Sequence, residues 1–218
     1  MIGLLGLALP GGFVRAQGQA FAKIISIDTT KFPVFTTLVD TFDEQGNYVL
    51  GLTPAQVRVL EDGKEITPTS VQEFQPPISF VVAINSGPSL AVRDGFGFSR
   101  YNKAALVISN WAGARPSDSQ DDLSLAWNGG IVASHITPAE WKRRFDGLDP
   151  SPRTSEPGLA ALSFALDAAQ GAKTAPGQKK AILLLSGHLD TQEVAGLEDI
   201  TARARQSEIR IHVWILDS

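Results

Sequence analysis

Three short apolar runs constrain the fold more than any other feature of this sequence. They are Ile78–Ile84 (ISFVVAI), Lys180–Ser186 (KAILLLS) and Arg210–Leu216 (RIHVWIL). Continuous rather than alternating apolar residues are typical of strands in a parallel sheet, which is covered on both faces. Helical patterns separate the runs. This part of the chain therefore predicts a Rossmann-like α/β fold, an open and mostly parallel sheet with helices on both faces.

The segments between the runs carry recognisable helix and hairpin signals. Leu123–Trp127 and Ile131–Ala133 flank Asn128-Gly129-Gly130, a pattern that predicts two strands joined by a tight turn. Helices are expected where apolar residues recur at helical spacing or where a helix-capping pattern occurs. These segments are Ser99–Trp111, a helix opening at Thr137, Glu156–Gln170 and Leu197–Ser207.

The residues before the first apolar run have a different sequence pattern, which is typical of short β-strands. Val34–Phe42 is rich in β-branched and aromatic residues, and Val57–Glu61 alternates apolar and charged residues before an Asp62-Gly63 turn. Gln75-Pro76-Pro77 marks the boundary, because prolines interrupt strand pairing. We expect a small β-sandwich-like module over residues 22–75 and the α/β domain over residues 78–218.

Composition excludes several classes of function. The chain has 218 residues, of which 43% are hydrophobic, so it is not disordered, and its net charge is −4 with scattered Lys and Arg. That balance offers no basic surface for nucleic acid or anionic lipid. The absence of cysteine excludes zinc ribbons, iron–sulfur clusters, thiol catalysis and disulfide partners.

The N-terminus has the pattern of an export signal. Ile2–Val14 is apolar and is too short to span a bilayer as a helix, and Val14-Arg15-Ala16 places small residues where a signal peptidase cleaves. No positive charge precedes Arg15, which a start codon placed too late would explain. We expect residues 1–20 to be a signal peptide and the protein to be exported, to the cell envelope or the extracellular space.

Two loops follow predicted parallel strands and are the first candidates for a binding site. Asn85–Ser89 follows the first apolar run, and Ser186–Asp190 follows the second. In open α/β sheets, ligands bind in the crevice at the carboxyl ends of the strands. We therefore expect a crevice lined by residues of these loops.

The element order and these loops resemble a von Willebrand factor type A domain. The resemblance covers residues 78–218, and residues 49–63 resemble segments that precede such domains in bacterial exported proteins. It implies a metal-ion-dependent adhesion site with the pattern Asp-x-Ser-x-Ser, a later Thr and a later Asp. Here the first Asp position is Asn85, the two Ser positions are Gly87 and Ser89, the Thr position is Thr154, and the late Asp position is Ser186.

Both carboxylates of that pattern are replaced in this chain. Mg²⁺ is a hard ion that binds oxygen ligands, and carboxylates offset the cost of removing it from water. We therefore expect no metal and no other cofactor, and instead a crevice that contacts a ligand directly through Asn85, Ser86, Ser89, Thr154, Ser186 and His188. Binding of Mg²⁺ by Asn85, Ser89 and Thr154 is the alternative.

A second departure concerns the end of the chain. Domains of this family have one more helix and strand after the fifth strand, whereas this sequence ends at Asp217-Ser218. We expect the domain to be truncated and the sequence to be a fragment. Contact with a membrane is expected only through a missing C-terminal segment.

The remaining patterns favour structural roles. Ser186, His188 and Asp190 are the residue types of a hydrolase triad, but Leu184 stands where the nucleophile turn requires glycine, so an enzyme is not expected. The three histidines lack metal-binding spacing, and His212 is expected to be a core residue. Asp121-Asp122 and Lys142–Arg144 are expected to be solvated.

Gly95–Phe98 is expected to form an exposed flap that, with Pro88 and Leu90, makes a partly apolar recognition rim. The leading hypothesis is an exported adhesion or interaction module that binds a protein ligand without strong metal dependence. The alternative is a structural scaffold domain of a larger envelope protein, whose crevice binds nothing.

Overall fold

The computed structural model describes residues 20–173, 175, 177–189 and 196–216. The chain divides into two compact units, Met1–Phe74, called the β unit here, and Gln75–Ser218, called the α/β unit. Residues 1–19 of the signal peptide expected over residues 1–20 lie outside the described residues, and so does Asp190. Among the helices that are described, none combines the length and apolar character needed to cross a bilayer.

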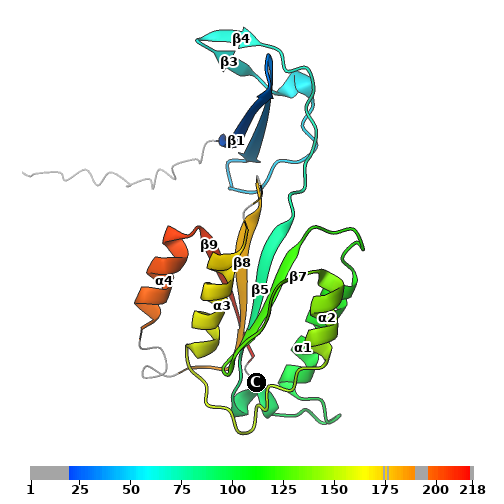
Figure 1. Cartoon of the computed structure of the whole chain (residues 1–218), viewed down its shortest axis with the longest axis vertical. Helices are drawn as coiled ribbons and strands as arrows, with labels where there is room; N and C mark the ends of the chain where they lie inside the picture. Colours follow the sequence, from blue (N-terminus) through cyan, green and yellow to red (C-terminus); the bar gives the residue numbers. More distant parts are fainter. Residues whose placement is uncertain (1–19, 174, 176, 190–195, 217–218) are drawn as a thin grey trace, which may run out of the picture. The chain divides into compact units, whose positions relative to one another are not determined.

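The α/β unit is built on a five-stranded sheet with the order β7-β6-β5-β8-β9 (Figure 1). Its strands are β5 (Ile78–Asn85), β6 (Asp122–Trp127), β7 (Gly130–Ile136), β8 (Lys179–Ser186) and β9 (Ile209–Ile215). β6, β5, β8 and β9 pair in parallel, and β7 pairs antiparallel with β6. The predicted open, mostly parallel sheet is confirmed, as is the hairpin that forms one of its edges.

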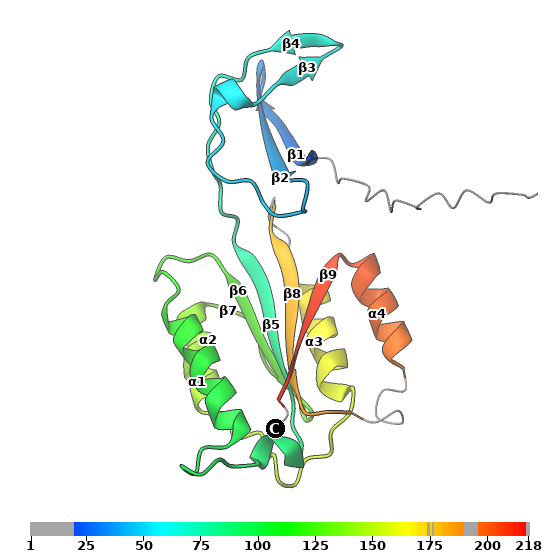
Figure 2. The same ribbon diagram turned by 180° about the vertical axis from the view of Figure 1, so that it is seen from behind.

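Helices cover the two faces of this sheet (Figures 1 and 2). The helices are α1 (Arg100–Gly113), α2 (Pro138–Asp146), α3 (Ala160–Gly171) and α4 (Leu197–Gln206). The views show α3 and α4 on one face and α1 and α2 on the other. Side chains of β5 alternate between the two layers: Val81 and Ala83 contact the α3 side, and Val82 and Ile84 contact the α1 side. This period of two explains why the whole β5 run is apolar.

Two of the helices begin where their capping residues predict. The Ser99 hydroxyl accepts a hydrogen bond from the Asn102 backbone N–H at the start of α1, and Thr137 accepts one from Glu140 N–H at the start of α2. α3 begins at Ala160, four residues later than the predicted start at Glu156. The reason is that Gly158 donates its N–H to the Asn85 side chain, so the chain is held in a loop there.

The layer under α2 is anchored by one aromatic side chain. Trp141 is fully buried, its Nε1–H donates to the backbone oxygen of Ser124 at 2.9 Å, and its ring stacks on Phe145 with centroids 4.7 Å apart. A buried indole needs a hydrogen-bond acceptor, and the β6 backbone supplies it. This contact fixes α2 against the sheet.

Two predictions about individual polar residues are wrong. His212 is exposed rather than a core residue, because β9 lies at the edge of the sheet that the described strands form. Asp121 is buried rather than solvated: it accepts a hydrogen bond from Ile78 N–H at 2.9 Å, and its carboxylate pairs with Arg115. Asp122 is half-buried and lies 2.9 Å from the His135 ring nitrogen Nδ1.

The β unit contains two separate two-stranded antiparallel sheets. They are formed by β1 (Phe21–Lys31) with β2 (Val34–Phe42), and by β3 (Val59–Glu61) with β4 (Lys64–Ile66). The predicted strands are present, but they form two hairpins rather than two packed sheets. No residue described from 20 to 74 is buried. Its most compact feature is an aromatic row in which the Phe42 ring lies 4.7 Å from Phe21 and from Tyr48.

Candidate functional site

The loops that follow β5, β6 and β8 meet at one end of the sheet, as their parallel pairing requires. Asn85 pairs in register with Ser186 at the end of β8, and Ile84 pairs with Trp127 at the end of β6. A short 3-10 helix, Pro88–Ala91, continues the chain after β5. The crevice residues predicted in the β5 and β8 loops are therefore neighbours.

The Asn85 side chain is occupied by hydrogen bonds within the protein. Its Nδ2 donates to the Ser186 hydroxyl at 2.8 Å, and its Oδ1 accepts from Gly158 N–H at 2.9 Å. Ser186 in turn donates to the Gly187 carbonyl at 2.7 Å. Asn85 and Ser186 are each 1% exposed. The two positions where the resemblance implies carboxylates are thus linked to each other as donor and acceptor.

A second network uses a residue that the sequence analysis assigned only to a turn. Asn128 accepts a hydrogen bond from Ser86 N–H at 2.7 Å, and its Nδ2 donates to the carbonyls of Ser86 and Glu156. The Ser86 hydroxyl donates to the Pro150 carbonyl at 2.8 Å. Asn128 follows β6, so its place beside the β5 loop could have been inferred from the parallel order.

The other predicted crevice residues differ in their access to solvent. Ser89 is half-buried and packs against the backbone of Gly187, where an added Cβ would lie 1.8 Å from the Ser89 hydroxyl. Thr154 is exposed, and its hydroxyl donates to the Ser151 carbonyl at 3.3 Å. His188 is exposed. The structure thus brings Asn85, Ser186 and Ser89 together, and it places Thr154 on a separate turn.

The donor set around Asn85 does not fit a divalent cation. The Asn85 amide oxygen already accepts an N–H, and its nitrogen, a donor, is directed at Ser186. Within the described residues, no group of three or more His, Cys, Asp or Glu side chains could hold a metal ion. A cation here would lack the carboxylate charge that offsets its desolvation. The side chains of Asn85 and Ser186 therefore do not fit a divalent metal ion.

The loop beside this network forms an ordered flap, Val92–Phe98. Asp94 organises it: its carboxylate accepts the backbone N–H groups of Phe96 and Phe98 at 2.9 and 3.0 Å, and it pairs with Lys103 of α1 at 2.6 Å. The hydrogen bond from Lys103, which outweighs burial, holds the pKa of Asp94 below its usual value. This well-bonded loop exposes Phe96 at 90% and Phe98 at 60%.

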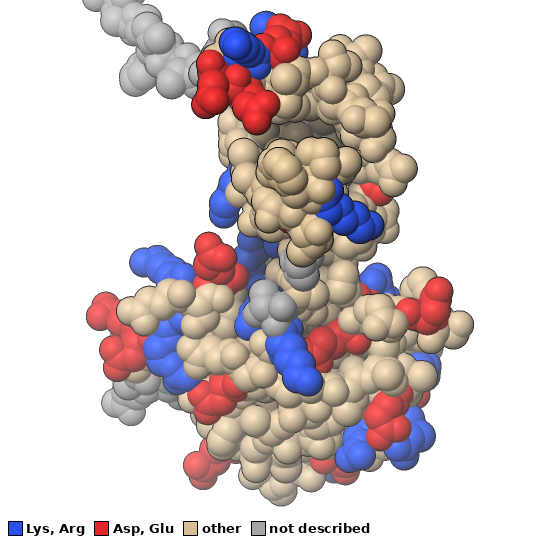
Figure 3. Space-filling view, turned by 45° about the horizontal axis from the view of Figure 1, so that its top comes forward, with Lys and Arg blue, Asp and Glu red and all other residues tan. Residues whose placement is uncertain are grey.

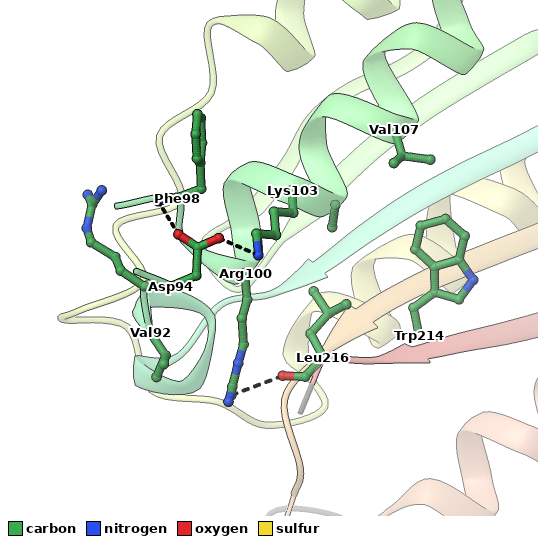
Figure 4. Close-up of a pocket in the computed structure, with 10 residues that line it drawn as sticks. Val92, Asp94, Phe98, Arg100, Lys103, Val107, Trp214 and Leu216 are labelled. Atoms are coloured by element: carbon green, nitrogen blue, oxygen red, sulfur yellow. Dashed lines mark hydrogen bonds and ion pairs between the residues drawn. The ribbon is translucent and has the colours of Figure 1, made fainter. Parts of the chain in front are cut away.

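A groove lies between α1 and β9, with the flap at one end (Figure 4). Its volume is about 530 Å³, and its apolar lining includes Val107, Trp214, Leu216, Val92 and Phe98. The Arg100 guanidinium donates to the backbone oxygens of Ser89 and Leu216 at 3.3 and 3.2 Å, so it ties the β5 loop to the end of β9. The groove therefore combines an apolar wall with cationic side chains.

The basic side chains of this groove differ in whether a carboxylate pairs with them. Lys103 pairs with Asp94, whereas Arg93 and Arg100 have no carboxylate partner within the part of the chain that the structure describes. Arg93 donates instead to the backbone oxygen of Gly97. Elsewhere acidic and basic residues are interspersed, as the face in Figure 3 illustrates. The groove is thus locally cationic on a protein of net charge −4.

Comparisons with known proteins give structural likeness only. No family model and no curated protein matches the sequence. Solved structures that match include the conserved hypothetical protein BatB from Bacteroides thetaiotaomicron, at 20% identity and TM-score 0.44, covering 62% of this chain and 65% of that one. An aerotolerance-related membrane protein from Bacteroides fragilis matches at 18% identity and TM-score 0.45, with coverages of 62% and 66%.

A third match is proximal thread matrix protein 1 from the mussel byssus, at 10% identity and TM-score 0.48, covering 63% of this chain and 36% of that protein. The chain spans less than two thirds of the length of each of these three structures. The assignment to an open α/β fold therefore depends on the strand order and pairing described above.

Proposed function

We propose that the chain is an exported protein-binding module that recognises its ligand through the flap and the α1–β9 groove, without a metal ion. The observation that carries this proposal is the flap itself. Asp94 holds a tight loop through several hydrogen bonds, and that loop keeps Phe96 and Phe98 in solvent. Large aromatic side chains on ordered loops are the residues that most often anchor protein interfaces.

The chemistry of the groove narrows the ligand. Val107, Trp214 and Leu216 favour an apolar side chain, and Arg93 and Arg100 favour an acidic group next to it. Guanidinium groups bind carboxylates with two parallel hydrogen bonds. We infer a protein ligand that presents an apolar residue beside an Asp or Glu. The resemblance to von Willebrand factor type A domains supports a binding role, since in that family the same end of the sheet contacts ligands.

The proposal assigns the buried polar network a structural role. Asn85, Ser86 and Ser186 are buried and bonded within the chain, so contact with a ligand would require breaking those bonds. Of the crevice residues predicted from sequence, His188, Thr154 and Ser89 keep some access to solvent. They are expected to form the margin of the interface.

A binding experiment with matched phenylalanine variants tests the proposal. The full chain is immobilised and exposed to envelope extract from cells that express it, and retained proteins are quantified for the wild type, Phe96→Ser and Phe74→Ser. Both phenylalanines are exposed, and only Phe96 lies in the flap. We expect a protein that is retained by the wild type and by Phe74→Ser, and lost with Phe96→Ser. Equal retention by all three would contradict recognition through the flap.

Independence from metal is tested separately. Retention is expected to persist in the presence of a metal chelator, and calorimetric titration with Mg²⁺ is expected to give no binding heat. A sub-millimolar affinity for Mg²⁺ that disappears in Asn85→Ala would contradict the metal-free interaction and favour binding of Mg²⁺ by Asn85, Ser89 and Thr154.

The alternative function is a scaffold domain of a larger envelope protein. The observation that favours it is the burial of Asn85 and Ser186, whose side chains are hydrogen-bonded within the protein and are hidden from solvent. On this alternative the exposed flap contacts a neighbouring domain of the same protein. The retention experiment would then find no specific partner for the wild type.

A further inference from the structure

The turn that joins β6 to β7 contains a chemically labile pair of residues, Asn128-Gly129. Asn128 is the only one of the five asparagines of the chain that is followed by glycine. A glycine at the next position leaves an asparagine open to deamidation, because no side chain hinders attack by the glycine backbone nitrogen on the amide carbon. Gly129 itself is exposed to solvent. The turn therefore contains a candidate modification site.

Both residues of this pair are required by the fold. A Cβ added to Gly129 would lie 2.5 Å from the Trp127 ring, so only glycine fits there. Asn128 joins two loops: its Nδ2 donates to the Ser86 and Glu156 carbonyls at 2.8 and 2.6 Å, and its Oδ1 accepts from Ser86 N–H at 2.7 Å. An amide supplies both the donors and the acceptor, which a carboxylate cannot do. The fold therefore keeps the labile pair in place.

The same hydrogen bonds restrain the reaction. Deamidation requires the Gly129 nitrogen to bond to Asn128 Cγ while Nδ2 leaves. In the folded loop, two carbonyls hold Nδ2 and a backbone N–H holds Oδ1, so the side chain is fixed and departure of Nδ2 breaks both of its hydrogen bonds. The reaction must therefore wait for a local opening of the loop, and its rate should follow the population of the open form.

We propose that Asn128 is a deamidation site whose rate is limited by its hydrogen bonds to Ser86 and Glu156, called the turn network here, and that the reaction opens this network permanently. The Gly129 nitrogen attacks Asn128 Cγ and forms a new C–N bond, and the proton of that nitrogen leaves with Nδ2 as ammonia. Water then opens the cyclic imide at one of its two carbonyl carbons. The product at position 128 is aspartate or isoaspartate, and water is the only co-reactant.

The product does not fit the turn network. A carboxylate has no N–H to donate, so the Ser86 and Glu156 carbonyls lose their partner and face a negative charge instead. The Ser86 carbonyl is partly buried, so it retains its desolvation cost without a hydrogen bond. In isoaspartate, an additional backbone methylene also lengthens the turn beside Trp127. Deamidation should therefore separate the β6–β7 turn from the loop after β5 and from the segment before α3.

Conversion rates in the folded and the unfolded chain test the restraint. The full chain is incubated at mildly alkaline pH, native or in urea, and digested samples are analysed by mass spectrometry, which detects the replacement of NH2 by OH at each asparagine. We expect Asn128 to convert at least about tenfold faster in urea than in the native chain. Asn110, which precedes tryptophan, is the internal control and should stay unconverted over the same period. Equal rates in the two states, or no conversion of Asn128 in urea, would overturn the proposal.

Two destabilised variants distinguish local opening of the turn network from unfolding of the whole α/β unit. Asn85→Ala removes the acceptor of the Gly158 N–H, two residues after Glu156, and leaves the Asn-Gly pair intact. Leu166→Ala truncates a fully buried side chain of α3 and leaves the bonds of the network in place. Asn85→Ala should raise the native-state conversion rate at least about threefold, and Leu166→Ala should change it less than about twofold. Equal acceleration by both variants would show that the reaction proceeds from the globally unfolded chain, which would contradict the proposal.

The permanent opening is tested with Asn128→Asp, which is the aspartate product of the reaction. Asn128→Ala is the matched control, because it removes the same hydrogen bonds without adding a charge. Hydrogen exchange in residues 86–91 and 150–159 of the full chain should be faster in Asn128→Asp than in the wild type, and at least as fast as in Asn128→Ala. Exchange in α4 should not change. Wild-type exchange rates in Asn128→Asp would show that the turn network accommodates a carboxylate, and the proposed opening would then be wrong.

Discussion

The two units of the chain differ most in how much side-chain surface they remove from water. In the α/β unit, buried residues form two apolar clusters, one on each face of the sheet. In the β unit, none of the residues described between 20 and 74 is buried. Since the hydrophobic effect scales with buried apolar area, the α/β unit must account for most of the folding free energy. The β hairpins depend instead on backbone ladders and exposed aromatic pairs.

The largest expected effect comes from the same substitution made in each unit. Leu125 in β6 is fully buried, whereas Leu60 in β3 is exposed. Leu125→Ala should lower the free energy of unfolding of the α/β unit by about 2–5 kcal/mol, because it leaves a cavity in the layer under α1 and α2. Leu60→Ala should change the stability of its hairpin by less than about 0.5 kcal/mol. Regional hydrogen exchange followed by mass spectrometry reports on both units.

Equal effects of the two leucine variants would contradict the difference drawn between the units. In the wild type, the same measurement should give slow exchange in β5 and β8 and much faster exchange in β1 to β4. Slow exchange throughout the β unit would mean that its side chains are buried by a partner or by contacts not seen among the described residues.

The next prediction concerns the polar network at the end of the sheet. Asn85→Ala removes a buried hydrogen bond to Ser186 and leaves the partly buried Gly158 N–H without its acceptor. The expected loss is about 2–4 kcal/mol, because a buried polar group without a partner retains its desolvation cost. Urea unfolding followed by tryptophan fluorescence measures this in the α/β unit, which contains all four tryptophans of the chain.

Asn110→Ala is the control for that variant. Asn110 is exposed on α1, and alanine has a higher helix propensity, so its effect should be near zero or slightly stabilising. If Asn85→Ala were equally neutral, the network would have no structural role, and a function in ligand contact would regain support.

The fold of the α/β unit could be predicted because its signals are local. Continuous apolar runs gave β5 and β8, and the capping residues Ser99 and Thr137 marked the starts of α1 and α2. The start of α3 was predicted too early. Its signal was overridden by a bond between Gly158 and Asn85, residues 73 positions apart in the chain. No local pattern contains a contact of that range.

The polar residues were harder to predict, for a physical reason. Two adjacent aspartates such as Asp121 and Asp122 are usually exposed to solvent. Asp121 can be buried here because Arg115 and the Ile78 N–H lie next to its carboxylate. Similarly, His212 lies in an apolar run, which favours a core strand. Among the described strands, β9 lies at the edge of the sheet, and this position decides the exposure of His212. The prediction that the loops after β5 and β8 lie at the same end of the sheet agrees with the pairing of Asn85 and Ser186, but the hydrogen bonds within these loops could not be predicted from sequence.

Asp121 also gives the α/β unit a predicted dependence on pH. Burial would raise the pKa of this carboxyl, but hydrogen bonds from Ile78 and Ser119 and the Arg115 guanidinium outweigh burial and hold the pKa below its usual value. A carboxyl with a lowered folded-state pKa stabilises the fold at pH values above its unfolded pKa of about 3.9, and this contribution is lost as pH falls through the folded value. Stability should therefore fall below about pH 4.

The variant Asp121→Asn isolates this contribution. It should lower the midpoint of thermal unfolding at pH 7, because Arg115 loses its charged partner. The difference from the wild type should shrink as the pH falls below about 4 and the Asp121 carboxyl of the wild type becomes protonated. Asp118→Asn, an exposed aspartate in the same loop, is the control. An unchanged difference between wild type and Asp121→Asn from pH 7 to pH 2.5 would contradict the assignment.

The smallest predicted effects are those of surface ion pairs. Their energies should be similar in the two units, but their effect on hydrogen exchange should differ. Lys142 pairs with Asp146 on α2, and Arg58 pairs with Glu65 across the β3–β4 hairpin. Each pair should couple by about 0.5 kcal/mol or less in a double-mutant cycle, because its charges are solvated. Arg58→Met should measurably speed hydrogen exchange in its hairpin, since little else stabilises those strands. Lys142→Met should leave exchange in α2 almost unchanged, because Trp141 and Phe145 hold that helix on the sheet. A stronger response in α2 than in the hairpin would show that the β unit is stabilised by more than its own ladders.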